Sequence, residues 1–340
     1  STREEIITNA CALADRIIDH VSEPMLEGGF THHIGASIGI SLFPDHGRDA
    51  TLLIENADKA MFEAKRQGSG CRLLFSEDLS ASRQQRFAME SRLREALENQ
   101  QFELYYQPIF ELDSCNIVAV EALIRWPQAN GEVLMPGAFM PVVEETGLIK
   151  PLGDWVLETA ARQLKAWHDQ GYKLSMAVNV SLNQLHSGCI AESFAALVKP
   201  HIDPCWIHLE VTENALMTDP EAIERLLEEL HTQGFQLAID DFGTGYSSLS
   251  RLQHLSIQTL KIDRSFINEL EKPNSKGAAL VSIIQQMAAS LNLHTVAEGI
   301  ETDKQRQILL ETAGSNGWGQ GFWFSRAIPT QALEARLREQ

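Results

Sequence analysis

Cysteine is scarce in this sequence and follows no spacing typical of a metal site. The five cysteines, Cys11, Cys71, Cys115, Cys189 and Cys205, stand far apart, and none forms a CxxC pair. This spacing argues against a structural zinc site and against a disulfide framework, and it is typical of a reducing compartment. We therefore expect a cytoplasmic chain.

Long apolar runs are also absent. No uninterrupted run approaches the roughly 20 residues of a membrane-spanning helix, and the charged start, Ser1 to Glu5, lacks the apolar core of a signal peptide. We expect no membrane segment in this chain. Because the sequence does not begin with Met, we expect a piece of a longer protein, whose other parts could carry a sensory or membrane region.

Positive charge is in short supply. The 28 Lys and Arg residues face 46 Asp and Glu residues, which gives a net charge of −18 at pH 7. Such a balance argues against a nucleic-acid polymer or an anionic membrane surface as partner. A small phosphate ligand stays open, because bound divalent cations can reverse the field at one pocket. The length of 340 residues suits one large domain and a small one.

The first part of the chain, residues 1–78, reads as a short α/β unit with too little core for a confident independent domain. A linker follows over residues 79–100, in which the apolar spacing predicts an amphipathic helix. The elements expected here are a strand within 31–43 that ends near Pro44, a strand over 72–75, and helices over 4–20, 49–67 and 82–99.

From residue 101 to 340, eight strand-like segments recur with helical segments between most of them. This order predicts an α/β fold, a (β/α)8 barrel. Only residues 113–116 join the first two strands, whereas a parallel connection needs about a dozen residues. We therefore expect a modified TIM-like barrel with one antiparallel strand. A doubly wound open sheet is the alternative, but no glycine-rich fingerprint follows the first strand. The strands are expected over 102–111, 117–126, 174–181, 206–212, 235–241, 257–263, 294–299 and 318–324.

Two adjacent carboxylates end the fifth of these strands. Asp240 and Asp241 follow an apolar strand and precede a turn containing Gly243 and Gly245. Neighbouring strand residues point to opposite faces, so the pair can serve one site only if the chain turns there. Two hard oxygen donors would suit one or two divalent cations. An ordinary Asp-rich turn explains the pair equally well, and the pair alone leaves both readings open.

Polar residues recur at the same end of seven strands. A single Glu, Asn or Lys at a strand end has an ordinary explanation as a rim residue, a cap or an ion-pair partner. The regular recurrence favours a site, because catalytic residues gather at the C-terminal ends of barrel strands. The residues are Glu121, Arg125, Asn179, Glu210, Glu213, Asp240, Asp241, Lys261, Asp263, Glu298, Glu301 and Gln320.

The types of side chain in this set favour Mg²⁺ or Mn²⁺ over Zn²⁺, because they are hard oxygen donors. Paired aspartates fit a two-metal site acting on a phosphodiester. Lys261 could hold a water or a developing charge by a charge-assisted hydrogen bond. Glu298 is a candidate base or a further ligand.

Residues 85–340 resemble the EAL domain family of bacterial second-messenger signalling. The motifs that carry the resemblance are 121–126 (EALIRW), 179–181 (NVS), 210–213 (EVTE), 240–249 (DDFGTGYSSL), 261–263 (KID), 297–301 (AEGIE) and 320–322 (QGF). The resemblance implies a modified barrel that hydrolyses cyclic di-GMP to linear pGpG with two Mg²⁺ or Mn²⁺ ions per site. Ca²⁺ is expected to inhibit, because it distorts a small octahedral site.

Roles carry over by position in these motifs. The metal ligands implied are Glu121, Asn179, Glu210, Asp240 and Asp241, the last at the second ion. Lys261 and Glu298 resemble the residues that position and activate the water, so they join Glu121 as catalytic residues. The implied substrate contacts are Gln107, Leu123, Arg125, Asn179, Asp263, Glu301 and Gln320. Glu213 resembles the glutamate that steadies the loop at 241–249, which is coupled to dimerisation, so a homodimer through this domain is implied.

Residues 1–78 resemble the C-terminal half of a GGDEF domain, the cyclase that makes cyclic di-GMP. The similar stretches are 36–40 (ASIGI), 57–61 (ADKAM) and 64–65 (AK). The signature Gly-Gly-Asp/Glu-Glu-Phe is absent, and we interpret 28–30 (GGF) as a hairpin turn. We therefore expect no cyclase activity, and a unit that packs on or links to the barrel.

Three functions remain after these comparisons of motifs: an active phosphodiesterase, a catalytically silent cyclic di-GMP receptor, and a scaffold acting through the N-terminal unit. Silent members usually lose a metal ligand, the lysine or the loop glutamate. All of these are present here, which favours the enzyme.

Overall fold

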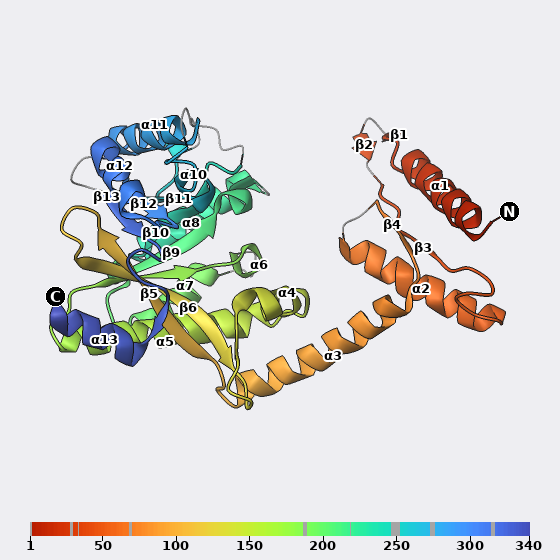
Figure 1. Ribbon diagram of the computed structural model, residues 1–340, viewed down its shortest axis with the longest axis horizontal. Coiled ribbons are helices and arrows are strands. Elements are labelled where there is room, and N and C mark those ends of the chain that lie inside the picture. The colour runs from red at the N-terminus through yellow and green to blue at the C-terminus, as the bar shows by residue number, and fades with distance from the viewer. Residues whose placement is uncertain are drawn as a thin grey trace. The chain divides into compact units, whose positions relative to one another are not determined.

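The computed structural model describes residues 2–27, 30–32, 34–67, 70–185, 189–217, 219–245, 252–272, 276–313 and 317–340. The chain divides into two compact units, residues 1–92 and 93–340. The division lies within helix α3 (Glu77–Glu98), which overlaps the predicted linker and begins earlier than residue 82. The predicted domain bounds at residues 78 and 100 stay a prediction. Figure 1 shows the order of the elements along the chain.

The first unit is a small α/β structure. Helices α1 (Arg3–Val21) and α2 (Ala50–Gln67) both pack against the parallel pair of β3 (Ile38–Ile40) and β4 (Arg72–Leu74). Gly39 lets α2 approach, because a Cβ there would lie 1.9 Å from the carbonyl oxygen of Ala57. Thr2 and Glu5 cap the start of α1 reciprocally.

Residues 31–43 contain a strand, as predicted, but this strand is β3 and it ends at Ile40 rather than near Pro44. It pairs with β4, whereas the preceding β2 (Phe30–His32) pairs antiparallel with β1 (Met25–Glu27). Glu27 pairs with Phe30, which fits the predicted hairpin, but the turn residues 28 and 29 lie outside the described residues.

The second unit is a closed barrel of eight strands, as predicted. The strands in chain order are β5 (Glu103–Glu111), β6 (Ile117–Pro127), β8 (Ser175–Asn179), β9 (Ile207–Thr212), β10 (Gln236–Phe242), β11 (Thr259–Ile262), β12 (His294–Glu298) and β13 (Gly317–Gln320). Strand β5 is antiparallel to both of its barrel neighbours, β6 and β13, and the remaining neighbours pair in parallel. The short connection at 113–116 therefore predicted the antiparallel strand correctly.

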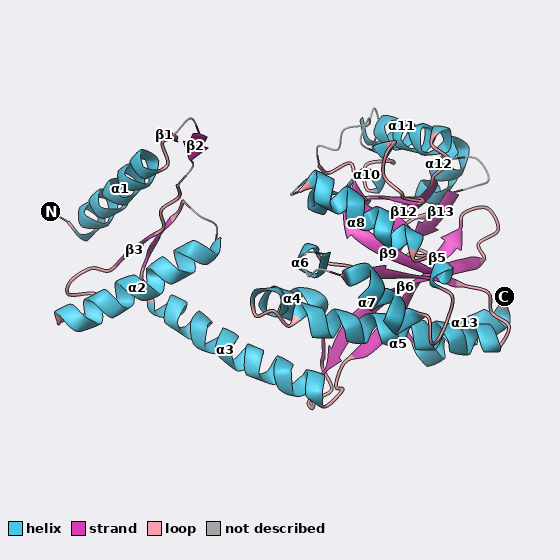
Figure 2. Ribbon diagram, turned by 180° about the vertical axis from the view of Figure 1, so that it is seen from behind, coloured by secondary structure: helices cyan, strands magenta, loops and turns pink. Residues whose placement is uncertain are grey.

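Helices cover the strands of the barrel unit, as Figure 2 shows. They are α4 (Pro136–Glu145), α5 (Ile149–Asp169), α6 (Leu182–Leu185), α7 (Ile190–Val198), α8 (Pro220–Thr232), α10 (Arg264–Ile267), α11 (Lys276–Ser290), α12 (Asp303–Ala313) and α13 (Thr330–Glu339). Shorter elements are β7 (Val133–Leu134), β14 (Ile328–Pro329) and the 3₁₀ turns η1 (Pro204–Trp206) and η2 (Glu213–Met217).

The core lies between the strands and these helices. In α5, Leu157, Leu164 and Trp167 are buried, and the Trp167 ring packs edge-on against Tyr106 of β5 at 4.9 Å between centroids. Burial of each such side chain stabilises the fold by about 1.5–3 kcal/mol. This packing fixes the strands whose ends carry the polar residues.

The eighth strand ends earlier than predicted. Strand β13 stops at Gln320, and residues 321–324 form a turn instead. The backbone at Gly321 passes so close to Ile300 that a Cβ would lie 2.1 Å from the Ile300 carbonyl oxygen. That approach bends the chain away from the ladder.

Within the described residues, no helix combines the length and the apolar character needed to cross a bilayer.

Candidate functional site

Lys261 lies at the centre of the polar residues that end the barrel strands. Its Nζ is 2.8 Å from Glu210 Oε2 and 2.8 Å from Glu298 Oε1. Asp240 Oδ1 is 3.3 Å away and Glu121 Oε2 is 3.6 Å away. Lys261 is only 1% exposed. One buried cation thus holds four carboxylates from four different strands.

Two amides complete this network. Asn179 Nδ2 donates to Glu121 Oε1 at 2.7 Å. Gln320 Nε2 donates to Glu121 Oε2 at 2.9 Å and to Glu298 Oε1 at 2.8 Å. The strand register produces the contact between Gln320 and Glu298, because the two residues pair across adjacent parallel strands. The amide nitrogens of Asn179 and Gln320 are thus used, and their carbonyl oxygens can bind a ligand. The buried Gln320 Oε1 has no hydrogen-bond partner within the described part of the chain.

The side chains of the two adjacent aspartates lie close together because the backbone turns at the end of β10. Asp241 has a φ of 54°, a left-handed conformation that is uncommon outside glycine. Its amide donates to Asp240 Oδ1 at 2.9 Å. One oxygen each of Asp240, Asp241 and Glu298 lie within 4.8 Å of one another. The structure therefore brings Asp240, Asp241 and Glu298 into one group of oxygen atoms.

Burial and the surrounding charges set the protonation of the innermost groups. For Lys261, burial lowers the pKa, but the charges of Glu121, Glu210 and Glu298 outweigh it and raise the pKa well above its usual value. Burial raises the pKa of Glu210 well above its usual range. In Glu121, burial acts upward but is outweighed by Lys261 and the amide hydrogen bonds, so its pKa is lowered.

The carboxylates at the edge of the network hold protons more tightly than usual. Burial raises the pKa of Glu298 to about 7, despite its contact with Lys261. Burial, followed by the charges of Asp240 and Asp263, raises the pKa of Asp241. Acids crowded in this way gain from a bound cation, which stabilises their charged forms.

The donor set fits a hard divalent cation. The Asp240, Asp241 and Glu298 oxygens are close enough to share an ion, and Asn179 joins the same network because its Nδ2 donates to Glu121. Glu121 and Glu210 offer further carboxylate oxygens, although both lie within reach of Lys261. Carboxylate and amide oxygens without His or Cys favour Mg²⁺ or Mn²⁺ over Zn²⁺.

Glu213 holds the start of the loop that follows β10. Its Oε2 accepts hydrogen bonds from the amides of Gly243 at 2.8 Å and Gly245 at 3.1 Å. Glu213 is 2% exposed, and a Cβ at Gly245 would lie 2.9 Å from its Oε1. The structure therefore contains hydrogen bonds through which Glu213 can steady the loop, as its predicted role requires. The rest of the loop, from residue 246, lies outside the described residues.

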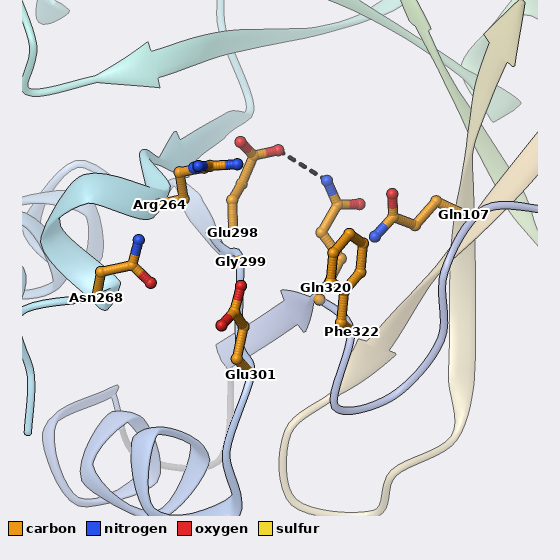
Figure 3. Close-up of a pocket in the computed structure, with 9 residues that line it drawn as sticks. Gln107, Arg264, Asn268, Glu298, Gly299, Glu301, Gln320 and Phe322 are labelled. Carbon is orange, nitrogen blue, oxygen red and sulfur yellow. Dashed lines mark hydrogen bonds between the residues drawn. The ribbon is translucent and has the colours of Figure 1, made fainter. Parts of the chain in front are cut away.

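A pocket of about 220 Å³ opens beside Glu298. In Figure 3, Arg264 at the start of α10 and Asn268 just after its end lie on one side, and Gln107, Gln320 and Phe322 lie on the other. Glu298, Gly299 and Glu301 lie between the two sides. The predicted contacts Gln107, Glu301 and Gln320 thus share one pocket.

Three residues of this pocket carried no predicted role: Arg264, Asn268 and Phe322. Arg264 follows Asp263 directly in the sequence. A basic residue next to an acid at a strand end was therefore the one sequence feature that could have indicated its place in the pocket. Phe322 is 54% exposed, and the Arg326 guanidinium lies 3.9 Å from the centroid of its ring. An exposed aromatic face of this kind can stack on a nucleobase.

A second pocket, of about 340 Å³, is lined in part by Asn179. The predicted contact Leu123 lines it, together with Met140 of α4 and Ile149 and Leu152 of α5. This lining is mostly apolar, which suits the flat face of a base. The sequence did not reveal the helices α4 and α5 as part of the site.

Neither Arg125 nor Asp263 contacts Lys261 directly among the ion pairs of the described residues. Arg125 is 5% exposed, donates to the Ile124 carbonyl oxygen at 2.8 Å and lies 5.6 Å from the centroid of the Tyr105 ring. Asp263 caps α10 by accepting from the amide of Ser265 at 3.0 Å, while its charge raises the pKa of Asp241. Their roles as substrate contacts stay predictions.

Known proteins share this arrangement. The family model of the EAL domain matches residues 90–327, and that of the diguanylate cyclase GGDEF domain matches residues 1–71. The bifunctional diguanylate cyclase/cyclic di-GMP phosphodiesterase MucR of Pseudomonas aeruginosa is 40% identical over 331 residues, which cover 97% of this chain and 48% of MucR. The cyclic di-GMP phosphodiesterase NbdA of the same organism is 38% identical over 328 residues, 96% of this chain and 42% of NbdA.

A solved structure also resembles this chain. The structure described as PaMucR phosphodiesterase in complex with c-di-GMP superposes with a TM-score of 0.68 at 41% identity, covering 72% of this chain and 99% of that one. The chain spans less than half the length of the two curated relatives, MucR and NbdA. The barrel, the ordered motifs at its strand ends and these matches together show that the chain belongs to the EAL domain family, with a GGDEF-domain match at its start.

Proposed function

We propose that the chain hydrolyses cyclic di-GMP to linear pGpG in a reaction that requires Mg²⁺ or Mn²⁺. One observation carries the proposal. Lys261 is buried among carboxylates from four strands, beside the oxygen group of Asp240, Asp241 and Glu298. This arrangement combines a positive side chain for a developing phosphate charge with oxygen donors for divalent cations.

Asp240, Asp241, Glu121, Asn179 and Glu210 are the proposed ligands of two ions. Bound divalent cations would supply an acidified water and would neutralise charge on the phosphoryl oxygens. The crowded acids favour this occupancy, because the pKa values of Glu210 and Asp241 are raised when only protein groups surround them.

Lys261 and Glu298 are proposed to handle the attacking water. Lys261 Nζ can donate to that water and keep its oxygen directed at the phosphorus, because its hydrogen bonds already fix it beside Glu210 and Glu298. Glu298 can accept the proton of the water as a general base, because its Oε1 lies 2.8 Å from Lys261 Nζ, the proposed donor to the same water. The water oxygen bonds to phosphorus, the bond to the ribose O3′ breaks, and that oxygen takes up a proton.

The two pockets are proposed to receive the two halves of the dinucleotide. Gln107, Glu301 and Gln320 offer hydrogen-bonding side chains in one pocket. Leu123 and Asn179 line the other, mostly apolar pocket. The predicted contacts of Arg125 and Asp263 belong to the same proposal. MucR in its solved structure is described in complex with c-di-GMP, which supports this choice of substrate.

A homodimer through the barrel unit is proposed as well, with the loop that Glu213 holds linking the dimer to the site. A cytoplasmic location is also proposed. Neither is needed for the chemistry above.

Purified chain incubated with cyclic di-GMP and Mg²⁺ tests the proposal. We expect pGpG to accumulate, EDTA to stop its formation, and Ca²⁺ to inhibit. Binding of cyclic di-GMP without turnover would contradict the proposal and would favour the silent receptor.

A further inference from the structure

Arg264 is an unpaired cation beside the proposed catalytic group. It lies at the start of α10, one residue after Asp263, and lines the pocket with Glu298, Gly299 and Glu301. No ion pair or hydrogen bond joins its guanidinium to another residue in the described part of the chain. A free guanidinium in a pocket is a ready site for an anion, because its planar donors match phosphate oxygens in pairs.

The backbone is shaped to admit this side chain. Gly299 has a φ of 73°, and a Cβ at that position would lie 2.6 Å from the Cβ of Arg264. Glycine therefore allows Arg264 to pass close to the end of β12. Figure 3 shows the Arg264 side chain extending toward Glu298.

The pocket is continuous with the proposed metal group but reaches beyond it. Glu298 belongs to both, because it lines the pocket and shares the oxygen cluster with Asp240 and Asp241. Asp240 and Asp241 do not line the pocket, whereas Arg264 does. A ligand phosphate at Arg264 would therefore lie outside the oxygen group of the two aspartates and be a different phosphate from the one held there.

We propose that Arg264 binds the second, uncleaved phosphate of a cyclic dinucleotide whose first phosphate lies at the Asp240–Asp241–Glu298 group. The proposal rests on the proposed function and extends it. It makes Arg264 a selectivity residue for diesters that carry two phosphates in one ring. Phosphodiesters with a single phosphate would gain nothing from it.

Two substrates separate this role from a general one. Cyclic di-GMP carries both phosphates, whereas bis(p-nitrophenyl) phosphate carries only the scissile one. For Arg264→Gln we expect kcat/KM on cyclic di-GMP to fall about 10-fold or more, since a charge-assisted hydrogen-bond pair is lost. On bis(p-nitrophenyl) phosphate we expect kcat/KM within about 2-fold of the unsubstituted chain. Arg264→Lys should restore part of the loss, because lysine keeps the charge but not the paired donors.

Arg162→Gln is the matched control, because Arg162 is an arginine on α5 that is 61% exposed and lines neither pocket. We expect it to leave both substrates unchanged. Titration calorimetry of cyclic di-GMP into the Ca²⁺-loaded chain should show a Kd raised by a similar factor in Arg264→Gln alone.

An equal loss on both substrates, or no loss on either, would overturn the role of Arg264 while leaving the proposed function in place. If the unsubstituted chain neither binds nor cleaves cyclic di-GMP, the proposed function fails and the role of Arg264 fails with it. Equal melting temperatures of Arg264→Gln and the unsubstituted chain would exclude misfolding as the cause of a loss.

Discussion

Replacing Lys261 by Met removes the one buried cation that contacts all four strand-end carboxylates described above. Lys261 Nζ is 2.8 Å from both Glu210 and Glu298 and 3.3 Å from Asp240. Breaking a buried ion pair from one side costs about 3–5 kcal/mol, because a buried charge is left uncompensated. For a unit the size of residues 93–340, this corresponds to a fall in Tm of roughly 6–20 °C.

Divalent cations should restore part of the stability that Lys261→Met loses. A bound cation supplies positive charge to the same acids, and at 100 times its Kd it stabilises the folded chain by about 2.7 kcal/mol. We therefore expect the Tm difference between Lys261→Met and the unsubstituted chain to be largest in EDTA and smaller in saturating Mg²⁺. Turnover should remain lost in both conditions, because the water loses its donor.

Differential scanning fluorimetry in EDTA and in Mg²⁺ measures both differences. Lys304→Met is the control, because Lys304 is 66% exposed and pairs with Glu271 only at 3.8 Å. Such a surface pair contributes about 0–1 kcal/mol. A Tm of Lys261→Met within about 2 °C of the unsubstituted chain in EDTA would refute the reasoning, because the carboxylates would then not depend on this cation.

Three further predictions concern the acids of the site. The pKa of Glu298 is raised from 4.5 to about 7, so the folded state binds an extra proton between these values. Glu298 alone should therefore lower the unfolding free energy of the metal-free chain by on the order of 3 kcal/mol from below pH 4.5 to above pH 7. Urea unfolding across this range should show the fall, and Glu298→Gln should reduce it by about this amount, leaving the part that Glu210 and Asp241 contribute. Glu213→Gln should weaken the hydrogen bonds to the amides of Gly243 and Gly245. We expect it to lower the unfolding free energy by about 1–3 kcal/mol and to reduce kcat at saturating substrate. An unchanged kcat would show that turnover does not depend on these hydrogen bonds to the loop. Glu121→Ala should abolish turnover, because it removes a proposed ligand and the acceptor of the Asn179 hydrogen bond, and a quenched assay with separation of pGpG would detect any residual activity that speaks against this role.

The strands of the barrel could be predicted because each is a short apolar run that ends in polar residues. The connection at 113–116 is too short for a crossover, and this length alone predicted the antiparallel pairing of β5 and β6. The convergence of Glu121, Lys261 and Glu298 followed from the same pattern, since the C-terminal ends of parallel strands meet at one edge.

Other features depended on contacts that no local pattern encodes. The end of β13 is set by the close approach of Gly321 to Ile300, a contact between segments that the sequence does not relate. Arg264 looks like a surface residue in sequence, and only the turn of α10 and the space at Gly299 bring it into the pocket. The apolar pocket depends on how α4 and α5 pack beside β6.

Hydrolysis of cyclic di-GMP in water enriched in ¹⁸O, with Mg²⁺ present and the product analysed by mass spectrometry, tests the central claim most directly. We expect linear pGpG that carries one ¹⁸O atom in its terminal phosphate, formed only while the divalent cation is present. Recovery of intact cyclic di-GMP from a chain that binds it, or product formation that EDTA does not stop, would contradict a metal-dependent water attack at this site.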